Sequence, residues 1–328
     1  PEEDVLQNRV FGAWLGRICG CLLGKPIEGI RTDELNQLLS ACGNRPLYRY
    51  LEESDITPEL CNTLSFRLRG KAYADTVPCA PVDDDTNYTV LSWVLIDKYG
   101  RDFTPYDVTL VWLDYQPKNA YCTAERVAYR NFVAGYRPPY SAQYKNPYRE
   151  WIGAQIRGDY YGYINPGNPE AAAEMAWRDA CISHTGNGIY GEMFVAAMIA
   201  TAAVETDLEK IVEAGLGQIP EKSRLAEGIR EILGKFRAGV SERDCFRYIH
   251  SRFDERNTYD WCHVISNAMI VTAALLWGSG NYSRSICMAV ETGFDTDCNG
   301  ATVGSVLGMR NGADCIGQQW RKPLNGML

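Results

Sequence analysis

Glycine recurs at every fourth position of an apolar segment near the N-terminus, and this spacing constrains the fold more than any other feature. The segment runs from Val10 to Leu23 and contains Gly12, Gly16 and Gly20, and Gly24 follows it directly. Each glycine inside a helix costs about 1 kcal/mol relative to alanine. Four at helical spacing therefore indicate a smooth stripe that another helix or a ligand approaches closely. We expect a tightly packed central helix here.

Helical periodicity also dominates the rest of the chain, whereas no alternating run of five or more residues has hairpin turns at both ends. We therefore predict an all-α fold in a single domain over residues 1–328. Helices are expected from Thr32 to Leu39, from Thr86 to a stop at Gly100, over 191–204, over 264–277, from a cap at Asn281 or Ser283 through Val290, and over 300–309. A Tyr/Pro/Gly-rich segment at 136–167 is predicted to be mostly loop, serving as a surface loop, a substrate wall or a subunit contact.

Composition narrows the classes of function. The chain carries 33 basic and 41 acidic side chains, a net charge of −8, with no basic block, which argues against nucleic acid and anionic membranes as partners. The 12 cysteines form no C-x-x-C pair, so zinc-ribbon and thioredoxin-type sites lack their usual spacing. With no secretory signal or membrane-spanning run in the sequence, we expect reduced cysteines in a cytoplasmic protein.

Two acidic clusters each precede an expected helix. The first is Asp83-Asp84-Asp85-Thr86, and the second contains Asp295 and Asp297. Helix capping explains one aspartate at each position, but three consecutive carboxylates repel one another and usually require solvent or a cation. Carboxylate oxygens are ligands that hard divalent ions prefer. If the clusters meet, they would favour a pair of Mg²⁺, Mn²⁺ or Ca²⁺ ions.

Two further elements have both a structural and a functional interpretation. Glu28 follows the glycine-striped segment in a turn, where it is either a solvated carboxylate or part of an acidic site. His184 lies in the glycine-rich turn 183–191, where it is either a core histidine or a ligand contact. That turn leads into a helix, whose free N–H groups offer an anion-binding position.

Four segments, taken together and in their order along the chain, resemble the ADP-ribosylglycohydrolase family, which includes dinitrogenase-reductase-activating glycohydrolase. They are GAWLGRICGCLLGKPIEG at 12–29, DDDT at 83–86, SHTGNGIYG at 183–191 and GFDTDCNGATVGSVLG at 293–308. The resemblance implies an all-α fold with two Mg²⁺ ions in a central cleft. It also implies hydrolysis of the C1″ bond of ADP-ribose to a protein side chain or related acceptor.

The resemblance also implies roles for individual residues. Metal ligands would be Asp83, Asp84, Asp85, Asp295, Asp297 and the residue at Cys298. Glu28 would bind or face the second metal. For the chemistry itself, we take Glu28 and Asp84 as the candidates for proton transfer. Substrate contacts would come from Gly153, Arg157, His184, Asn187 and Gly293.

The sequence departs from the family pattern at two places. Cys298 stands where the family has a metal-binding threonine, so water, Asp83 or a different metal would have to compensate. In the expected diphosphate-binding segment, 152–157, only Gly153 and Arg157 fit. Three functions stay open: a hydrolase of ADP-ribosyl substrates, a hydrolase of a smaller N- or O-riboside without a diphosphate, and a catalytically silent binding or structural protein. The sequence does not indicate an oligomeric state.

Overall fold

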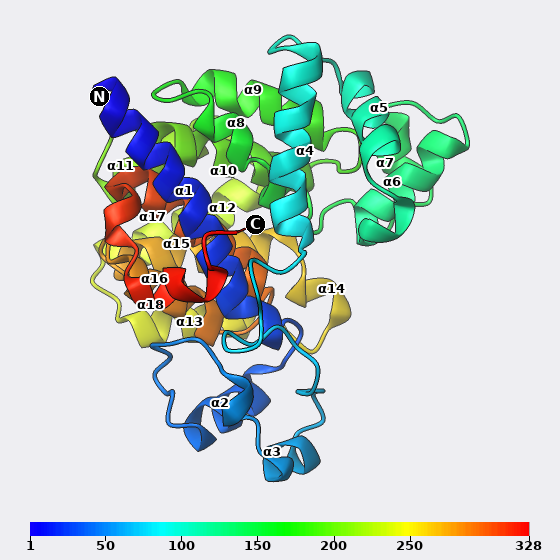
Figure 1. Cartoon of the computed structure of the whole chain (residues 1–328). Coiled ribbons are helices and arrows are strands. Elements are labelled where there is room, and N and C mark those ends of the chain that lie inside the picture. The colour runs from blue at the N-terminus through cyan, green and yellow to red at the C-terminus, as the bar shows by residue number, and fades with distance from the viewer. Residues whose placement is uncertain (328) are drawn as a thin grey trace. The chain divides into compact units, whose positions relative to one another are not determined.

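The computed structural model describes residues 1–327, which form helices joined by turns and loops (Figure 1). Within this range the only extended pairing is an isolated bridge between Trp151 and His263, so the all-α prediction is confirmed. The chain divides into two compact units. Unit 1 comprises Pro1–Val82, Glu231–Cys262 and Ser266–Leu328, and unit 2 comprises Asp83–Arg230 and His263–Ile265. The prediction of one domain over residues 1–328 stays a prediction.

Unit 1 is built mainly from the two ends of the chain. Its helices are α1 (Glu3–Gly24), α2 (Thr32–Ala41), α3 (Pro58–Thr63), α13 (Glu242–Arg252), α14 (Thr258–Trp261), α16 (Tyr282–Glu291), α17 (Thr296–Asn311) and α18 (Gln318–Arg321), with most of α15 (Val264–Trp277) and the end of α12 (Arg224–Arg237).

The glycine stripe of α1 packs directly against a second glycine stripe on α17. A Cβ atom built on Gly12 would lie 2.5 Å from the carbonyl carbon of Gly312, and one built on Gly20 would lie 2.5 Å from that of Gly300. Side chains at these positions would hold the helices apart, so the stripe permits backbone-to-backbone packing. The hydroxyl of Tyr282 on α16 donates to the Gly16 carbonyl at 2.8 Å, which adds a third helix to this core.

The length and composition of α1 would also suit a membrane-spanning helix. However, 72% of its most apolar window is buried inside the structure. This burial is accounted for by the contacts with α17 and α16 described above, as expected for the core helix of a globular unit.

Unit 2 is organised around α10 (Asn187–Ala202), whose side chains are almost all apolar and buried. Around it pack α8 (Asp159–Tyr163), α9 (Pro169–Ala180) and α11 (Leu208–Leu216). The remaining helices of the unit are α4 (Asp84–Tyr99), α5 (Pro105–Tyr115), α6 (Thr123–Val133), α7 (Tyr140–Gln143) and the start of α12. Glu192 is the single carboxylate within α10 and is fully buried, so it must be neutralised or paired inside the unit.

The Tyr/Pro/Gly-rich segment is partly helical and partly buried. It contains α7, α8 and the short 3-10 helix η4 (Gln155–Arg157). Its first half is held by Asn131, whose amide donates to the carbonyls of Ser141 at 2.7 Å and Tyr144 at 2.8 Å. Its second half supplies core side chains, including Trp151 and Tyr161. Aromatic residues in this segment therefore build the core as well as the surface.

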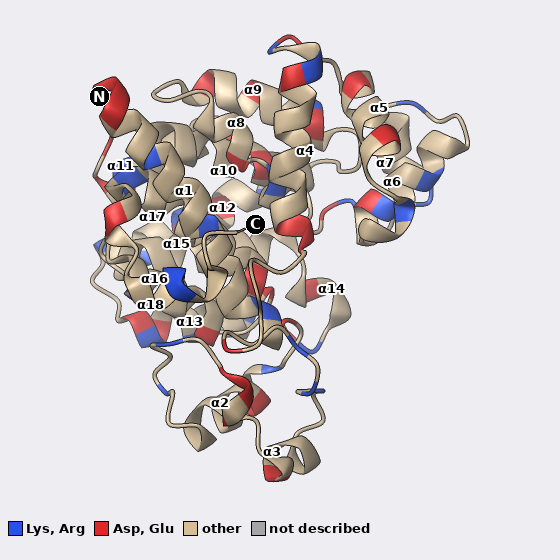
Figure 2. Cartoon of the chain, viewed as in Figure 1, with Lys and Arg blue, Asp and Glu red and all other residues tan. Residues whose placement is uncertain are grey.

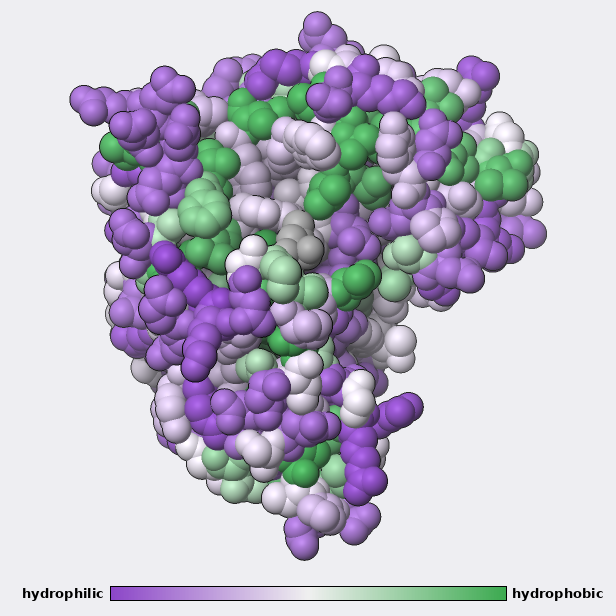
Figure 3. All heavy atoms as spheres, viewed as in Figure 1, coloured by the Kyte–Doolittle hydropathy of each residue, from purple (hydrophilic) through white to green (hydrophobic). Residues whose placement is uncertain are grey.

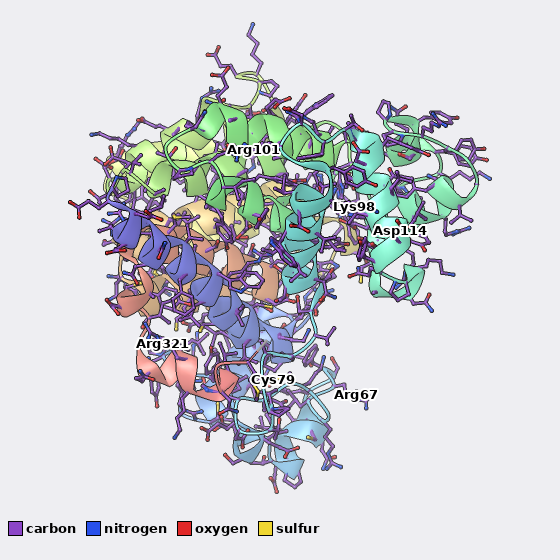
Figure 4. All side chains as sticks on the ribbon, turned by 45° about the horizontal axis from the view of Figure 1, so that its top comes forward. Arg67, Cys79, Lys98, Arg101, Asp114 and Arg321 are labelled. Atoms are coloured by element: carbon purple, nitrogen blue, oxygen red, sulfur yellow. The ribbon has the colours of Figure 1, made fainter. Side chains whose placement is uncertain are left out.

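The outer surface of unit 2 is polar with scattered apolar side chains. Lys98 on α4 and Asp114 on α5, both labelled in Figure 4, form an exposed ion pair at 3.3 Å. Val90 and Trp93 on α4 are exposed, and small hydrophobic patches lie over this part of the face drawn in Figure 3. Single exposed apolar residues of this kind are normal in soluble proteins.

Candidate metal centre and its surroundings

Three carboxylates from the two ends of the chain meet in unit 1. One oxygen of Glu28 and one each of Asp295 and Asp297 lie within 4.8 Å of one another. Glu28 follows the 3-10 helix η1 (Lys25–Ile27) that extends α1, and the two aspartates begin α17. Glu28 is exposed, whereas both aspartates are buried. The sequence-predicted acidic residues of this unit thus form one cluster, with its open side at Glu28.

Close packing between α1 and α17 brings these carboxylates together. A Cβ on Gly24 would meet the backbone of Thr296 and Asp297, so only glycine lets the end of α1 lie against the start of α17. The Thr296 hydroxyl donates to the Gly24 carbonyl at 2.9 Å. These contacts fix the position of the turn that carries Glu28.

Neighbouring polar side chains orient Asp295. Its backbone N–H donates to Oδ1 of Asn267 on α15 at 3.2 Å, and Asn267 also accepts from the amide of Asn299 at 2.8 Å. The Cys262 thiol lies 3.4 Å from Oδ2 of Asp295. Asn267 is fully buried in an apolar helix, and this polar position within 264–277 is a signal that the sequence analysis did not use.

The turn before Asp295 has a backbone conformation that favours glycine. Gly293 has φ = +78° and Phe294 has φ = +59°, both in the left-handed region. Gly293 is buried, and a Cβ there would lie 2.8 Å from both the Thr32 hydroxyl and the Glu255 carboxylate. Gly293 therefore shapes the entry to α17, and the predicted substrate contact at this residue stays a prediction.

The second acidic cluster lies at the start of α4 in unit 2. One oxygen of each of Asp83, Asp84 and Asp85 lies within 4.8 Å of the other two, and the acidic start of this helix is visible in Figure 2. Asp83 is the N-cap of α4, and its carboxylate accepts from the Asp85 N–H at 2.9 Å. The capping interpretation thus holds for Asp83, while the other two carboxylates exceed what capping requires.

The donor chemistry of both clusters fits a hard divalent cation. Each set offers three carboxylate oxygens at close range, and like charges so close are stabilised by a cation between them. Cys298 follows Asp297 directly on α17 and is buried. A neutral thiol is a poor ligand for Mg²⁺, so within each cluster the carboxylates are the residues that would hold such an ion.

Arg157 lies at the centre of a buried polar network in unit 2. Its Nε donates to Asp179, Nη1 donates to Glu125 at 3.1 Å and to the Gly153 carbonyl at 3.4 Å, and Nη2 donates to the Asp179 carbonyl at 3.2 Å and to Ser183 Oγ at 2.8 Å. These five hydrogen bonds match the five N–H groups of a guanidinium. The Glu192 carboxylate lies 3.6 Å from Nε.

The network shifts the pKa values of its carboxyl groups. Burial raises the pKa of Glu192 well above its usual value, and nearby Asp179 raises it further. Burial also raises the pKa of Glu125, although Arg157 opposes this shift. Because Arg157 is the one arginine among three carboxylates, a neutral Glu192 leaves the network closer to charge balance.

His184 belongs to the same network. Its Nδ1 lies 2.8 Å from Ser183 Oγ, its Nε2 lies 3.9 Å from Glu125, and the side chain is buried. Burial and the charge of Arg157 hold the pKa of His184 well below its usual value, which keeps the imidazole neutral. Gly153 packs on Glu125, because a Cβ there would overlap the carboxylate. These contacts are those of a histidine in the buried core.

Asn187 begins α10 and is bound to a neighbouring carboxylate. Glu150 Oε1 accepts from the Asn187 backbone N–H at 3.0 Å and from its side-chain amide at 2.8 Å. The Asn187 carbonyl oxygen Oδ1 accepts from the Leu225 N–H at 3.0 Å. Asn187 thus connects the starts of α10 and α12. Glu150, which the sequence analysis did not single out, is the acceptor at the predicted anion position.

The predicted residues form groups inside each unit. Within unit 1 the structure groups Glu28, Asp295 and Asp297. Within unit 2 it groups Asp83, Asp84 and Asp85, and it also groups Gly153, Arg157 and His184. The roles assigned to these residues, and to Cys298, Asn187 and Gly293, stay predictions.

Comparison with known proteins identifies the family. A model described as ADP-ribosylglycohydrolase matches residues 2–327. No curated protein sequence matches the chain. One solved structure, named "ADP-ribosylglycohydrolase-related protein complex", has 18% sequence identity and a TM-score of 0.64, and the match covers 98% of this chain and 93% of that chain. At this identity the likeness shows the fold, and the fold agrees with the family match. The chain therefore belongs to the ADP-ribosylglycohydrolase family.

Proposed function

We propose that this protein is a metal-dependent glycosidase that hydrolyses the C1 glycosidic bond of a ribosyl group. The cluster of Glu28, Asp295 and Asp297 carries the proposal, because three carboxylates held within 4.8 Å form a ligand set for a hard cation. Family membership supports an ADP-ribosylated protein or an ADP-ribose derivative as the substrate. We further propose that Asp83, Asp84 and Asp85 are metal ligands as well, and that the protein binds two divalent cations, most simply Mg²⁺.

The chain's own carboxylates would move the protons of this reaction. Attack by water forms a bond from its oxygen to C1, and the bond from C1 to the leaving group breaks with its electron pair. Glu28 is the exposed carboxylate of its cluster, so it is suited to accept the proton that the water loses. Asp84, which is partly exposed, is the candidate to protonate the leaving group. Divalent cations, when bound, would orient the ribose hydroxyls and lower the pKa of the water.

A smaller riboside without a diphosphate is the second candidate substrate. Ile152, at the start of the expected diphosphate-binding segment, and Trp151, directly before it, have bulky buried side chains. Arg157 in the same segment already uses its N–H groups within unit 2. These observations favour a substrate that has no diphosphate for this segment to bind.

A substitution series with a metal control tests the proposed activity. Hydrolysis of ADP-ribosylated peptide and of free N- and O-ribosides is measured with Mg²⁺ and with EDTA. Asp297→Asn and Asp84→Asn should each abolish turnover, and Asp297→Asn should also remove the rise in melting temperature that Mg²⁺ causes in the wild type.

Asp102→Asn is the matched control, because it makes the same chemical change at an exposed aspartate outside both clusters. It should keep wild-type turnover and the wild-type response to Mg²⁺. Full turnover in the Asp84→Asn, Asp297→Asn double variant would show that these carboxylates are not the active site. A folded wild type that neither responds to Mg²⁺ nor hydrolyses any riboside would favour the catalytically silent alternative.

A further inference from the structure

Asn267 is a fully buried amide among apolar side chains of α15 in unit 1. A buried amide is tolerated when its polar atoms are hydrogen-bonded. Its oxygen accepts from the Asp295 backbone N–H at 3.2 Å and from the side-chain amide of Asn299 at 2.8 Å. Its NH₂ group donates to the Trp261 carbonyl at 3.1 Å. Asn267 thus connects the chain before α15 to the start of α17, where the acidic cluster begins.

These three hydrogen bonds fix the direction in which the amide points. In the reversed orientation, the NH₂ group of Asn267 would face the two donors on α17, and its oxygen would face the Trp261 carbonyl. Only the observed orientation pairs every donor with an acceptor. The Asn267 oxygen is therefore held in one place against the backbone of Asp295.

Asp295 is attached to α17 in an unusual way for an aspartate at a helix start. It is the N-cap of α17, yet its carboxylate makes no capping hydrogen bond, whereas the carboxylate of Asp83 does cap α4. One Asp295 oxygen instead lies within 4.8 Å of oxygens of Glu28 and Asp297. The side chain thus serves the acidic cluster, and the hydrogen bond to Asn267 anchors the residue by its backbone.

The turn before Asp295 increases the need for such an anchor. Gly293 and Phe294 both have positive φ, and a conformation of this kind persists in a phenylalanine only when its surroundings hold it. The Phe294 ring is fully buried, with its centroid 5.0 Å from that of His250. This packing holds the turn at Phe294, and Asn267 holds it at the next residue, Asp295.

We propose that Asn267 is a positioning residue for the metal centre, which fixes Asp295 in the orientation that Mg²⁺ requires. The inference rests on the proposed metal-dependent function and adds a residue outside the carboxylate set. Asn267 acts through Asp295 and has no part in bond cleavage.

The two candidate cations should respond differently to the loss of this anchor. Mg²⁺ requires nearly ideal octahedral geometry, whereas Ca²⁺ accepts variable geometry and ligand number. Partners that hydrogen-bond a ligand residue typically change metal affinity by about 10- to 100-fold. Without Asn267, the Asp295 carboxylate can take several orientations, which should weaken binding of Mg²⁺ far more than binding of Ca²⁺.

Calorimetric titration of Mg²⁺ and, separately, of Ca²⁺ tests this role. Both ions are titrated into the wild type and into Asn267→Leu, which is similar in size but neither donates nor accepts a hydrogen bond. Asn267→Leu should bind one Mg²⁺ at least tenfold more weakly than the wild type, with less than a threefold change for Ca²⁺. A merely destabilised protein would not show this change in the ratio of the two affinities.

Asn44→Leu is the matched control, because Asn44 is also a fully buried amide of unit 1. It donates to the Arg49 carbonyl at 3.0 Å and accepts from the Tyr48 N–H at 3.1 Å, and it is not part of the acidic cluster. Asn44→Leu makes the same chemical change and should leave both metal affinities unchanged.

Three results would overturn the proposal: equal Mg²⁺ affinity in Asn267→Leu and the wild type, an equal loss for Mg²⁺ and Ca²⁺, or a similar loss of Mg²⁺ binding in Asn44→Leu. Asn267→Ser decides the question if Asn267→Leu does not fold, because its smaller side chain leaves room for water beside the Asp295 N–H. It should bind Mg²⁺ at least threefold more weakly than the wild type, and unchanged affinity would overturn the proposal.

The outcome for Asn267 is separable from that for the proposed function. A wild type that binds Mg²⁺ but hydrolyses no riboside would refute the function, while the comparison with Asn267→Leu still decides the positioning role. An active, Mg²⁺-dependent wild type with unchanged Mg²⁺ affinity in Asn267→Leu would refute the positioning role alone. A folded wild type that binds no Mg²⁺ would overturn both.

Discussion

Replacing Gly20 by alanine tests the helix pairing on which the acidic cluster of unit 1 depends. The added Cβ would lie 2.5 Å from the carbonyl carbon of Gly300 and closer still to its oxygen. Ordinary contacts begin near 3.4 Å and the oxygen lies at 2.0 Å, so the helices must separate by about 1.4 Å. A gap of about 0.5–1 Å removes a quarter to a half of the dispersion attraction between facing atoms. Neither helix can relieve the overlap with a rotamer change, because the opposing atoms are backbone.

The expected cost follows from two opposing contributions. Overpacking of this kind costs about 1–3 kcal/mol and sometimes more, and the backbone contact places Gly20→Ala at the upper end. The better helix propensity of alanine offsets about 1 kcal/mol. We expect a net loss of about 2 kcal/mol in the free energy of unfolding, measured by urea denaturation followed by circular dichroism. The melting temperature should fall by about 3–6 °C.

Gly234→Ala provides the matched control within the same unit. Gly234 lies inside α12, and a Cβ there would meet nothing within 4 Å. Only the propensity contribution remains, so this variant should gain about 0.5–1 kcal/mol. The same atomic change should therefore have opposite signs at the two positions. A Gly20→Ala variant as stable as Gly234→Ala would refute the proposed packing constraint.

Three further predictions follow from the buried groups. Arg157→Met should destabilise the protein by about 3–5 kcal/mol, because it leaves buried carboxylates without their cation; in the same urea assay, Lys98→Met, which breaks an exposed ion pair, should change stability little. The raised pKa of Glu192 means that, above about pH 4.5, the folded state keeps a proton that the unfolded state has lost. The free energy of unfolding therefore falls as the pH rises above this value. Glu192→Gln should reduce that slope and stabilise the protein at pH 7, and an unchanged pH profile would contradict this assignment. Cys298→Thr, which supplies the hydroxyl of the family pattern, should bind Mg²⁺ more tightly in calorimetric titrations, and equal or weaker binding would show that this position does not contact the ion.

Local sequence signals predicted the helices well because capping and stop residues act over a few positions. The prediction for 264–277 matches α15, and Asn281 is the cap of α16. The helix expected from Thr86 begins two residues earlier, at Asp84, because Asp83 supplies the cap. The loop prediction for 136–167 missed α7 and α8, whose short helices owe their burial to tertiary packing of aromatic side chains.

The sequence by itself determined the helical class, the glycine stripe and the two acidic clusters, because each is a pattern of neighbouring residues. Only the tertiary structure decided that the stripe of α1 faces α17, since this pairing joins residues about 280 positions apart. It also decided that Glu150 occupies the start of α10 and that Arg157 is saturated by buried partners. Such partners are brought together by folding, and no local spacing in the chain encodes which carboxylate will neutralise which cation.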